Sequence, residues 1–266
     1  MSKPLAVQLY TFREALASDR AAALRRVAAA GFGAVEPFGV GNSSLDDVRE
    51  LRRLLDENGL TVVATHGGWS TDESFDGVLD QLEVLGTDRL IAPAPGTVRG
   101  HGDAMKSVDG VRKLAEALNW SAERAAARGV RIGYHNHEFE WAELENGQPA
   151  YDVFVAELDP KVFLEIDIYW AHSAGQNPAE VVARYADRVE LLHAKDGPGG
   201  RVLQTAIGEG VVDNPGAIAA GAKVDHAIVE LDDCEGDPYD AARAGAEWLV
   251  SRGHAVWSVD GSSAGS

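Results

Sequence analysis

The sequence predicts an α/β protein with a single (β/α)8 barrel domain. Short apolar segments recur along the chain, and a helical segment follows each of them. The centres of the first four segments, Val7, Val35, Val63 and Ile91, are 28 residues apart. Parallel strands joined by crossover helices need such a short and regular period. Eight of these units fill about 250 residues, which is the usual length of a (β/α)8 TIM barrel.

The eight strands are predicted at residues 5–10, 33–37, 61–66, 89–92, 130–136, 162–168, 189–195 and 226–231. The helices are predicted at residues 20–30, 45–58, 75–85, 108–128, 150–157, 179–187, 215–221 and 238–250. Asp19 can cap the first helix, Gly31 can end it, and Pro178 suits the first turn of a later one. No Gly-x-Gly-x-x-Gly follows the first strand, so an open dinucleotide-binding sheet is the weaker alternative.

The barrel is predicted to span residues 1–252. Residues 253–266 end in Gly-Ser-Ser-Ala-Gly-Ser, and we expect them to form a flexible C-terminal tail.

Composition limits the classes of function. The net charge of −18 argues against a nucleic-acid partner, because phosphate binding needs clustered Lys and Arg. No apolar run approaches the roughly 20 residues of a membrane helix. The N-terminus has no signal-peptide pattern, and the single cysteine, Cys234, fits a reducing compartment. We therefore expect a cytoplasmic protein that does not act on membranes or DNA.

Polar residues recur where the predicted strands end. They are Gln8, Glu36, His66, His135, His137, Glu165, Asp167, His193, Lys195 and Glu230. A charged group within an apolar strand is costly unless it is paired or bound to metal. The active site of a (β/α)8 barrel is built from residues at the C-terminal ends of several strands. The pattern therefore predicts a site at this end of the barrel.

Three of these residues predict a metal site. Asp167, His193 and Glu230 lie at matching depth on three successive strands. Carboxylate and imidazole ligands together suit a divalent ion such as Mn²⁺, Co²⁺, Mg²⁺ or Zn²⁺. The fourth ligand should come from the preceding strand, where His135 is expected. Glu138 is the competitor, because the chain can already be turning there.

Several motifs resemble those of a known group. They are VQLYTFR at 7–13, GFGAVE at 31–36, YHNH at 134–137, LEIDIYW at 164–170, LHAKD at 192–196 and GEG at 208–210. Together they resemble the xylose isomerase-like TIM barrel superfamily. That superfamily includes sugar isomerases and epimerases, inosose dehydratase, dehydroshikimate dehydratase and endonuclease IV. The resemblance implies a metal held by Glu, Asp, His or Gln, and Glu on strands five to eight, and it implies a homodimer.

The chain departs from this family at two positions. His135 stands where the strand-five Glu of the family is expected, and Trp170 stands where the epimerases carry a His. Family epimerases use the glutamates of strands five and eight as paired bases. His135 does not fit that two-carboxylate arrangement, and one-base chemistry stays open, either ketose–aldose isomerisation or β-elimination of water.

The leading hypothesis is a metal-dependent isomerase or epimerase acting on a sugar, keto-sugar or sugar phosphate. His137 or Glu165 would remove the proton next to a carbonyl group. Lys195 would hold a substrate oxygen, or else form an ion pair with Glu165 or Asp167. The substrate contacts expected are Gln8, Glu36, His66 and Trp170.

Three alternatives accompany that hypothesis. A lyase resembling inosose dehydratase would remove water from a keto-sugar or keto-cyclitol by the same first step. A sugar-binding barrel without catalysis would have lost the strand-five carboxylate. An endonuclease IV-like activity is disfavoured by the acidic charge.

Overall fold

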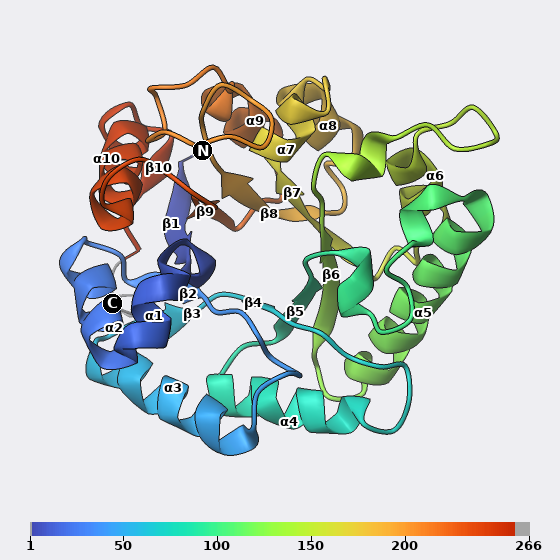
Figure 1. Cartoon of the computed structure of the whole chain (residues 1–266), viewed down its shortest axis with the longest axis horizontal. Helices are drawn as coiled ribbons and strands as arrows, with labels where there is room; N and C mark the ends of the chain where they lie inside the picture. Colours follow the sequence, from blue (N-terminus) through green and yellow to red (C-terminus); the bar gives the residue numbers. More distant parts are fainter. Residues whose placement is uncertain (1, 259–266) are drawn as a thin grey trace.

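The computed structural model describes residues 2–258, which form a parallel barrel surrounded by helices (Figure 1). Its strands are β1 (Lys3–Gln8), β2 (Ala34–Glu36), β3 (Thr61–Val62), β4 (Thr65–His66), β5 (Arg89–Ala92), β6 (Arg131–His135), β7 (Phe163–Asp167), β8 (Val189–Ala194), β9 (His226–Val229) and β10 (Ala255–Val256). Its α-helices are α1 (Arg13–Ser18), α2 (Arg20–Ala29), α3 (Leu45–Glu57), α4 (Phe75–Leu85), α5 (Val108–Ala126), α6 (Ala150–Glu157), α7 (Ile168–Ser173), α8 (Pro178–Arg184), α9 (Asn214–Ala220) and α10 (Pro238–Ser251).

The strands follow the order β3-β2-β1-β9-β8-β7-β6-β5-β4, and every pair is parallel. β3 and β4 are the two halves of the strand predicted at 61–66, so this strand closes the ring. Its first half pairs with β2 and its second half with β5. The amides of Val63 and His66 extend the contact to the β2 side, at 3.1 Å from Val35 O and 2.9 Å from Pro37 O. The predicted (β/α)8 barrel is confirmed.

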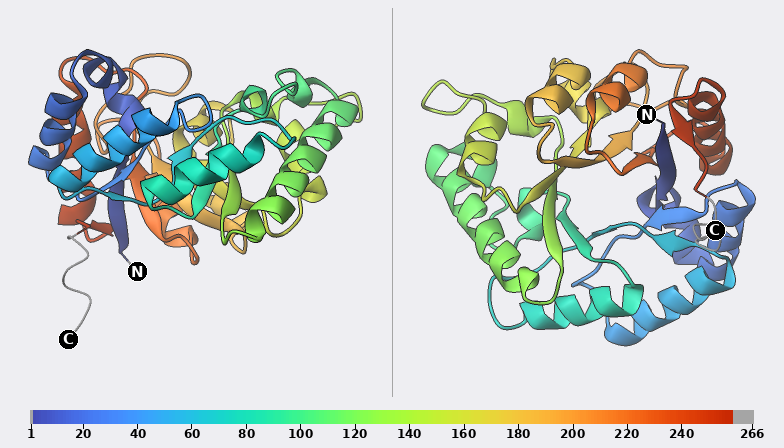
Figure 2. Two further views of the ribbon diagram at one scale, coloured as in Figure 1. Left: turned by 90° about the horizontal axis from the view of Figure 1, so that it is seen from below. Right: turned by 180° about the vertical axis from the view of Figure 1, so that it is seen from behind.

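The helices form the outer ring of the barrel (Figures 1 and 2). Polar side chains satisfy the free amides at several helix starts, as helix geometry requires. Asp19 caps α2 as predicted, with its carboxylate 2.9 Å from the amide of Ala22. Ser44 and Asp47 form a reciprocal capping box at the start of α3.

Two short helices at the mouth of the barrel were not predicted. α1 follows β1 through a 3-10 turn, and α7 starts directly after β7. Asp167 Oδ1 accepts a hydrogen bond from the amide of Trp170 at 2.9 Å and so caps α7. This contact fixes the Asp167 carboxylate and leaves its second oxygen, Oδ2, facing the barrel interior. α7 therefore matters directly to the site.

The barrel interior changes character along its axis. One half is filled by apolar residues of the strands, namely Ala6, Ala34, Ala64, Ile91, Phe163, Leu191 and Ile228. Gly133 leaves room for the Phe163 ring, because a Cβ there would lie 2.5 Å from it. Residues two apart on a strand share a face, so the interior residue that follows Leu191 is His193. By the same alternation, Glu165 follows Phe163 in the interior, and Glu230 follows Ile228.

The C-terminal segment includes a short strand that was not predicted. β10 pairs in parallel with β1, with Lys3 opposite Ala255 and Pro4 opposite Val256. The boundary drawn at residue 252 stays a prediction, and residues 259–266 of the expected tail lie outside the described residues. Among the described residues, each helix is too short or too polar to traverse a bilayer.

Candidate active site

Four side chains from four successive strands converge inside the barrel. His135 ends β6, Asp167 ends β7, His193 lies on β8, and Glu230 follows β9. All four are buried, and one ligand atom from each lies within 4.8 Å of the others. The facing atoms include Nδ1 of His193 and Oε2 of Glu230, which are 2.6 Å apart. Nε2 of His135 lies 3.7 Å from Oδ2 of Asp167.

The remaining nitrogen of each imidazole meets a second carboxylate. Nδ1 of His135 lies 3.1 Å from Oε2 of Glu165, and Nε2 of His193 lies 2.7 Å from Oε2 of Glu36. Gln8 donates a 2.7 Å hydrogen bond to that same oxygen of Glu36. Histidines that bind metals usually donate their other ring N–H to a carboxylate in this way, which orients the ring.

These contacts separate two overlapping groups of possible ligands. Besides the four residues above, a second group has ligand atoms close enough together to hold an ion. It consists of His66, His135, Glu165 and His193. Within it, Glu165 Oε2 lies 2.7 Å from Nε2 of His66 and 3.1 Å from Nδ1 of His135. Glu165 Oε2 is thus engaged by two imidazoles, whereas Asp167 Oδ2 accepts no imidazole hydrogen bond from the described residues and pairs with Lys195 Nζ at 2.9 Å. The donor set of His135, Asp167, His193 and Glu230 therefore fits a divalent cation better.

Burial and mutual contact shift the pKa values of this cluster. Burial, reinforced by the charge of Glu165, raises the pKa of Glu36 to about 7. Burial also raises the pKa of Asp167 to about 6, although Lys195 opposes this shift. Burial disfavours a charged His193, but the carboxylates of Glu165 and Glu230 outweigh it and raise the pKa of His193 well above its usual range. The cluster is a dense, charged network shielded from water.

Lys195 adds an ammonium group to this network. Its Nζ lies 2.9 Å from Asp167 Oδ2, 2.7 Å from Glu230 Oε2 and 2.8 Å from Asp232 Oδ2. Of the two interpretations of Lys195, the ion pair with Asp167 is present in the structure. Burial would lower the pKa of Lys195, but Asp167 and Glu230 outweigh it and raise that pKa well above its usual range. Lys195 is therefore a cation.

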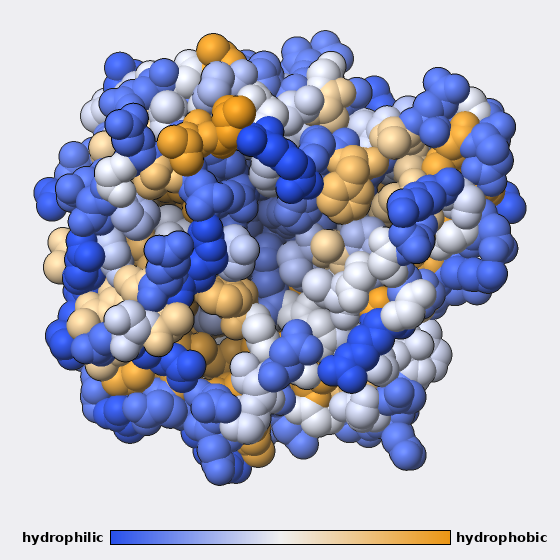
Figure 3. Space-filling view, viewed as in Figure 1, coloured by the Kyte–Doolittle hydropathy of each residue, from blue (hydrophilic) through white to orange (hydrophobic). Residues whose placement is uncertain are grey.

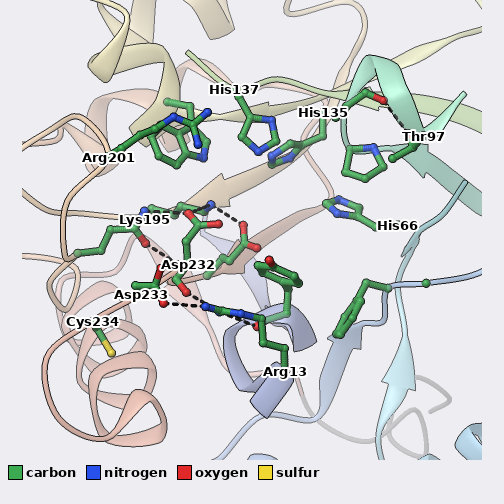
Figure 4. Close-up of a pocket in the computed structure, with 18 of the residues that line it drawn as sticks. Arg13, His66, Thr97, His135, His137, Lys195, Arg201, Asp232, Asp233 and Cys234 are labelled. Carbon is green, nitrogen blue, oxygen red and sulfur yellow. Dashed lines mark hydrogen bonds and ion pairs between the residues drawn. The ribbon is translucent and has the colours of Figure 1, made fainter. Parts of the chain in front are cut away.

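A cavity of about 820 Å³ opens above the cluster at the C-terminal end of the barrel. It is visible as the central hollow in Figure 3, and Figure 4 shows the side chains around it. His66, His135 and His137 follow one another along its wall, with ring centroids 5.0 and 5.1 Å apart. Trp170, Lys195 and Glu230 also line it. The size suits a small-molecule ligand.

The predicted site residues therefore occupy two layers. His66, His135, His137, Trp170, Lys195 and Glu230 face the cavity, whereas Gln8, Glu36, Glu165, Asp167 and His193 lie fully buried beneath its surface. Gln8 and Glu36 support His193 instead of reaching the cavity, and Glu165 lies behind the imidazoles. Of the two candidates for the strand-five ligand, Glu138 points elsewhere and forms an ion pair with Arg201 at 2.6 Å.

His137 is held differently from its neighbours. Its amide donates a 2.9 Å hydrogen bond to Glu140, which also accepts one from the Tyr134 hydroxyl at 2.8 Å. The ring nitrogen Nδ1 of His137 is buried and has no hydrogen-bond partner among the described residues. Burial and the charge of Lys195 lower the pKa of His137 to about 4. At neutral pH this imidazole is uncharged.

Sequence reasoning missed several residues of the cavity. Asp232 follows Glu230 by two residues, so the alternation of a strand could have found it. Tyr10 lies in the 3-10 turn after β1, Arg13 begins α1 and Phe38 follows β2, and strand alternation gives no signal at these positions. Arg13 reaches across the mouth to Asp233 at 2.6 Å.

Comparisons with known proteins agree with this architecture. Residues 24–252 match the family described as "Xylose isomerase-like TIM barrel". The chain is 25% identical over 191 residues to an inosose dehydratase of Clostridium botulinum (strain Alaska E43 / Type E3), covering 65% of this chain and 62% of that protein. The match thus spans less than two thirds of that relative.

Solved structures match this fold over a larger share of the chain. A structure described as a sugar phosphate isomerase/epimerase from Parabacteroides distasonis superimposes with a TM-score of 0.77 and 25% identity, covering 94% of each chain. The IOLI protein, whose crystal structure contains a zinc atom, has a TM-score of 0.60 at 18% identity, covering 93% of this chain and 97% of its own. At that identity the likeness to IOLI concerns the fold alone.

Proposed function

The chain belongs to the xylose isomerase-like TIM barrel family, and from that premise we propose that it is a metal-dependent enzyme that removes a proton next to a carbonyl group. The substrate would be a polyhydroxylated ketone or aldehyde. The observation that carries the proposal is that each of two imidazoles lies between two carboxylates. His135 and His193 each turn one nitrogen toward Asp167 or Glu230 and the other toward a buried carboxylate.

His135, Asp167, His193 and Glu230 would hold the ion. Imidazole donors favour Mn²⁺, Co²⁺ or Zn²⁺ over Mg²⁺, which prefers oxygen ligands. Zinc is the first ion to test, since it is present in the structure of the IOLI protein. A divalent ion bound at these ligands would act as a Lewis acid on the substrate carbonyl oxygen.

His137 would be the base. It lines the cavity, its Nδ1 has no hydrogen-bond partner among the described residues, and its low pKa keeps it uncharged. Glu165 is not carried forward as a base, because it is fully buried and does not line the cavity. Lys195 lines the cavity as a cation and would donate a hydrogen bond to a substrate oxygen.

The proton taken by His137 has two possible destinations. Its return to a hydroxyl group on the next carbon would release water, and its return to the neighbouring carbon would complete an isomerisation. We rank loss of water first, because the curated relative is named inosose dehydratase. Isomerisation, which sequence analysis ranked first, is the second candidate and is favoured by the likeness to a structure described as a sugar phosphate isomerase/epimerase.

Three measurements test the proposal. Elemental analysis after dialysis should find about one divalent ion per chain. Incubation in deuterated water should introduce deuterium next to the carbonyl of a substrate, and mass spectrometry of the product should show loss of one water. Turnover by a metal-free preparation would refute the metal role. Turnover without any deuterium incorporation or loss of water would refute proton removal.

A further inference from the structure

Large hydrophobic side chains gather at the mouth of the cavity, between the ion pairs of Arg13 and Arg201, whereas its floor is polar. Tyr10, Phe38, Val202 and Leu203 line the mouth and are 40, 37, 54 and 55% exposed. They are four of the eight large hydrophobic residues that are exposed among residues 2–258. Apolar atoms beside the central hollow are visible in Figure 3. Apolar surface gathered at one opening marks a binding surface, whereas scattered single residues do not.

The two residues that flank the exposed pair Val202–Leu203, Arg201 and Gln204, hold this pair over the opening. Arg201 binds Glu138 on one side at 2.6 Å. Gln204 donates from Nε2 to Asp232 at 2.9 Å, and its Oε1 accepts from the Asp232 amide at 2.8 Å. The loop after β8 is thus tied to the loops after β6 and β9. Two anchored residues therefore present two apolar side chains to solvent.

The other side of the mouth is aromatic. Tyr10 and Phe38 meet edge to face with their ring centroids 5.3 Å apart. The Arg13 guanidinium lies over the Tyr10 ring, 4.6 Å from its centroid. Trp170 lines the wall deeper in the cavity. Aromatic side chains gain most by contact with another ring or with the C–H face of a sugar.

The cations that line the cavity are already neutralised. They are Arg13, Lys195 and Arg201. Arg13 pairs with Asp233 at 2.6 Å, Arg201 pairs with Glu138 at 2.6 Å, and Lys195 contacts three carboxylates. A phosphate group needs unpaired Arg or Lys side chains or a cluster of free amides. These pairings disfavour a phosphorylated ligand.

We propose that the mouth is a subsite for the aromatic aglycone of an uncharged keto-glycoside, whose sugar ring carries the ketone and occupies the polar floor. The inference rests on the proposed function for the identity of the floor as a sugar site. It deepens that function by naming the substrate class. The cavity volume of about 820 Å³ leaves room for a second ring beside the sugar.

Paired ligands test the inference by isothermal titration calorimetry on the metal-loaded protein. The 4-nitrophenyl and methyl glycosides of glucose, galactose, mannose and xylose, which have no ketone and so report binding without turnover, are compared, together with glucose and glucose 6-phosphate. We expect at least one 4-nitrophenyl glycoside to bind about tenfold or more tightly than its methyl partner, because the aryl ring buries apolar area. Glucose 6-phosphate should bind no more tightly than glucose.

Substitutions at the mouth test which residues produce the aryl preference. Leu203→Ser and Phe38→Ala should each remove most of the aryl preference and leave the affinity for the methyl glycoside unchanged. Val211→Ser is the matched control, since Val211 is also exposed but does not line the cavity. Circular dichroism and the unfolding temperature confirm that each variant is folded.

The outcomes separate this inference from the proposed function. A panel in which no 4-nitrophenyl glycoside binds better than its methyl partner overturns the aglycone subsite, even if metal-dependent proton exchange is observed. Preferential binding of glucose 6-phosphate over glucose overturns it too. An aryl preference that depends on Leu203 supports the subsite even in a protein that fails the proton-exchange test.

Discussion

Nζ of Lys195 lies 2.7 Å from Oε2 of Glu230, the same oxygen that lies 2.6 Å from Nδ1 of His193. The ammonium also lies 2.9 Å from Oδ2 of Asp167. These two oxygens are the ones that face the proposed ion site. Lys195 and a divalent cation would therefore compete for the carboxylates of Asp167 and Glu230.

Lys195→Met is expected to raise the affinity for Mn²⁺ or Zn²⁺ by about tenfold or more. A unit charge about 3 Å from two ligand oxygens opposes a second cation by several kcal/mol at an effective dielectric constant of about 20. Calorimetric titration of the dialysed protein measures this affinity. Lys113→Met, which removes an exposed lysine paired with Asp109, should leave it unchanged. Equal affinities in the wild type and the Lys195 variant would refute the competition.

Glu36→Gln is expected to weaken metal binding by about 10- to 100-fold, as is usual for a carboxylate behind a histidine ligand. Glu36 orients His193 through the 2.7 Å contact with Nε2 and does not line the cavity. Chelator competition gives the affinity, with the exposed Glu57→Gln as control. A changed KM with unaltered metal affinity would instead restore the predicted role of Glu36 as a substrate contact.

His137→Asn is expected to lower kcat by about 10²- to 10⁴-fold, the usual contribution of a general base. The metal content should not change, because His137 is outside the proposed ligand set. Deuterium exchange next to the substrate carbonyl should fall in parallel with kcat. The half-buried His254→Asn, far from the cavity lining, serves as control. A variant that keeps its exchange rate would exclude His137 as the base.

Glu140→Gln tests how pH acts on stability. Burial raises the pKa of Glu140 from its ordinary value of 4.5 to about 8, despite hydrogen bonds from Tyr134 and the His137 amide. The folded protein therefore binds this proton more tightly than the unfolded chain. Protonated Glu140 therefore makes its full contribution to the free energy of unfolding below about pH 4.5, and this contribution is lost as pH rises through about 8.

The wild type should thus lose stability relative to Glu140→Gln between pH 5 and pH 8, by on the order of several kcal/mol. Urea unfolding at a series of pH values measures the difference. Glu143→Gln changes an exposed glutamate on the same loop and should follow the wild type. Parallel pH curves for the wild type and Glu140→Gln would show that Glu140 stays ionised in the fold.

Much of the architecture was predictable because it depends on local periodicity. Alternation along a strand places residues two apart on one face, so Asp167, His193 and Glu230 could be assigned to the barrel interior before any contact was known. Capping residues such as Asp19 are read within one turn of helix. The division of the third strand into β3 and β4 depends on its two neighbours and could not be read locally.

The depth of each polar residue was not predictable. Gln8, Glu36 and Glu165 share the strand-end pattern with His66 and His137, yet they lie beneath the cavity surface. A strand fixes which face a residue occupies, but how far its side chain extends depends on the neighbours it meets. Glu165 meets His66 and His135, and so it supports them instead of facing a ligand.

The sequence by itself determined the barrel, the end of the barrel that carries the site and the residue types available there, because these follow from period and composition along one segment at a time. The tertiary structure decided which atoms face one another. It turned His135 toward Asp167 and Glu138 toward Arg201, and it set the Lys195 ammonium between Asp167 and Glu230. Such choices depend on distances of 2.6–3.7 Å between strands and loops far apart in the chain, and no local pattern encodes them.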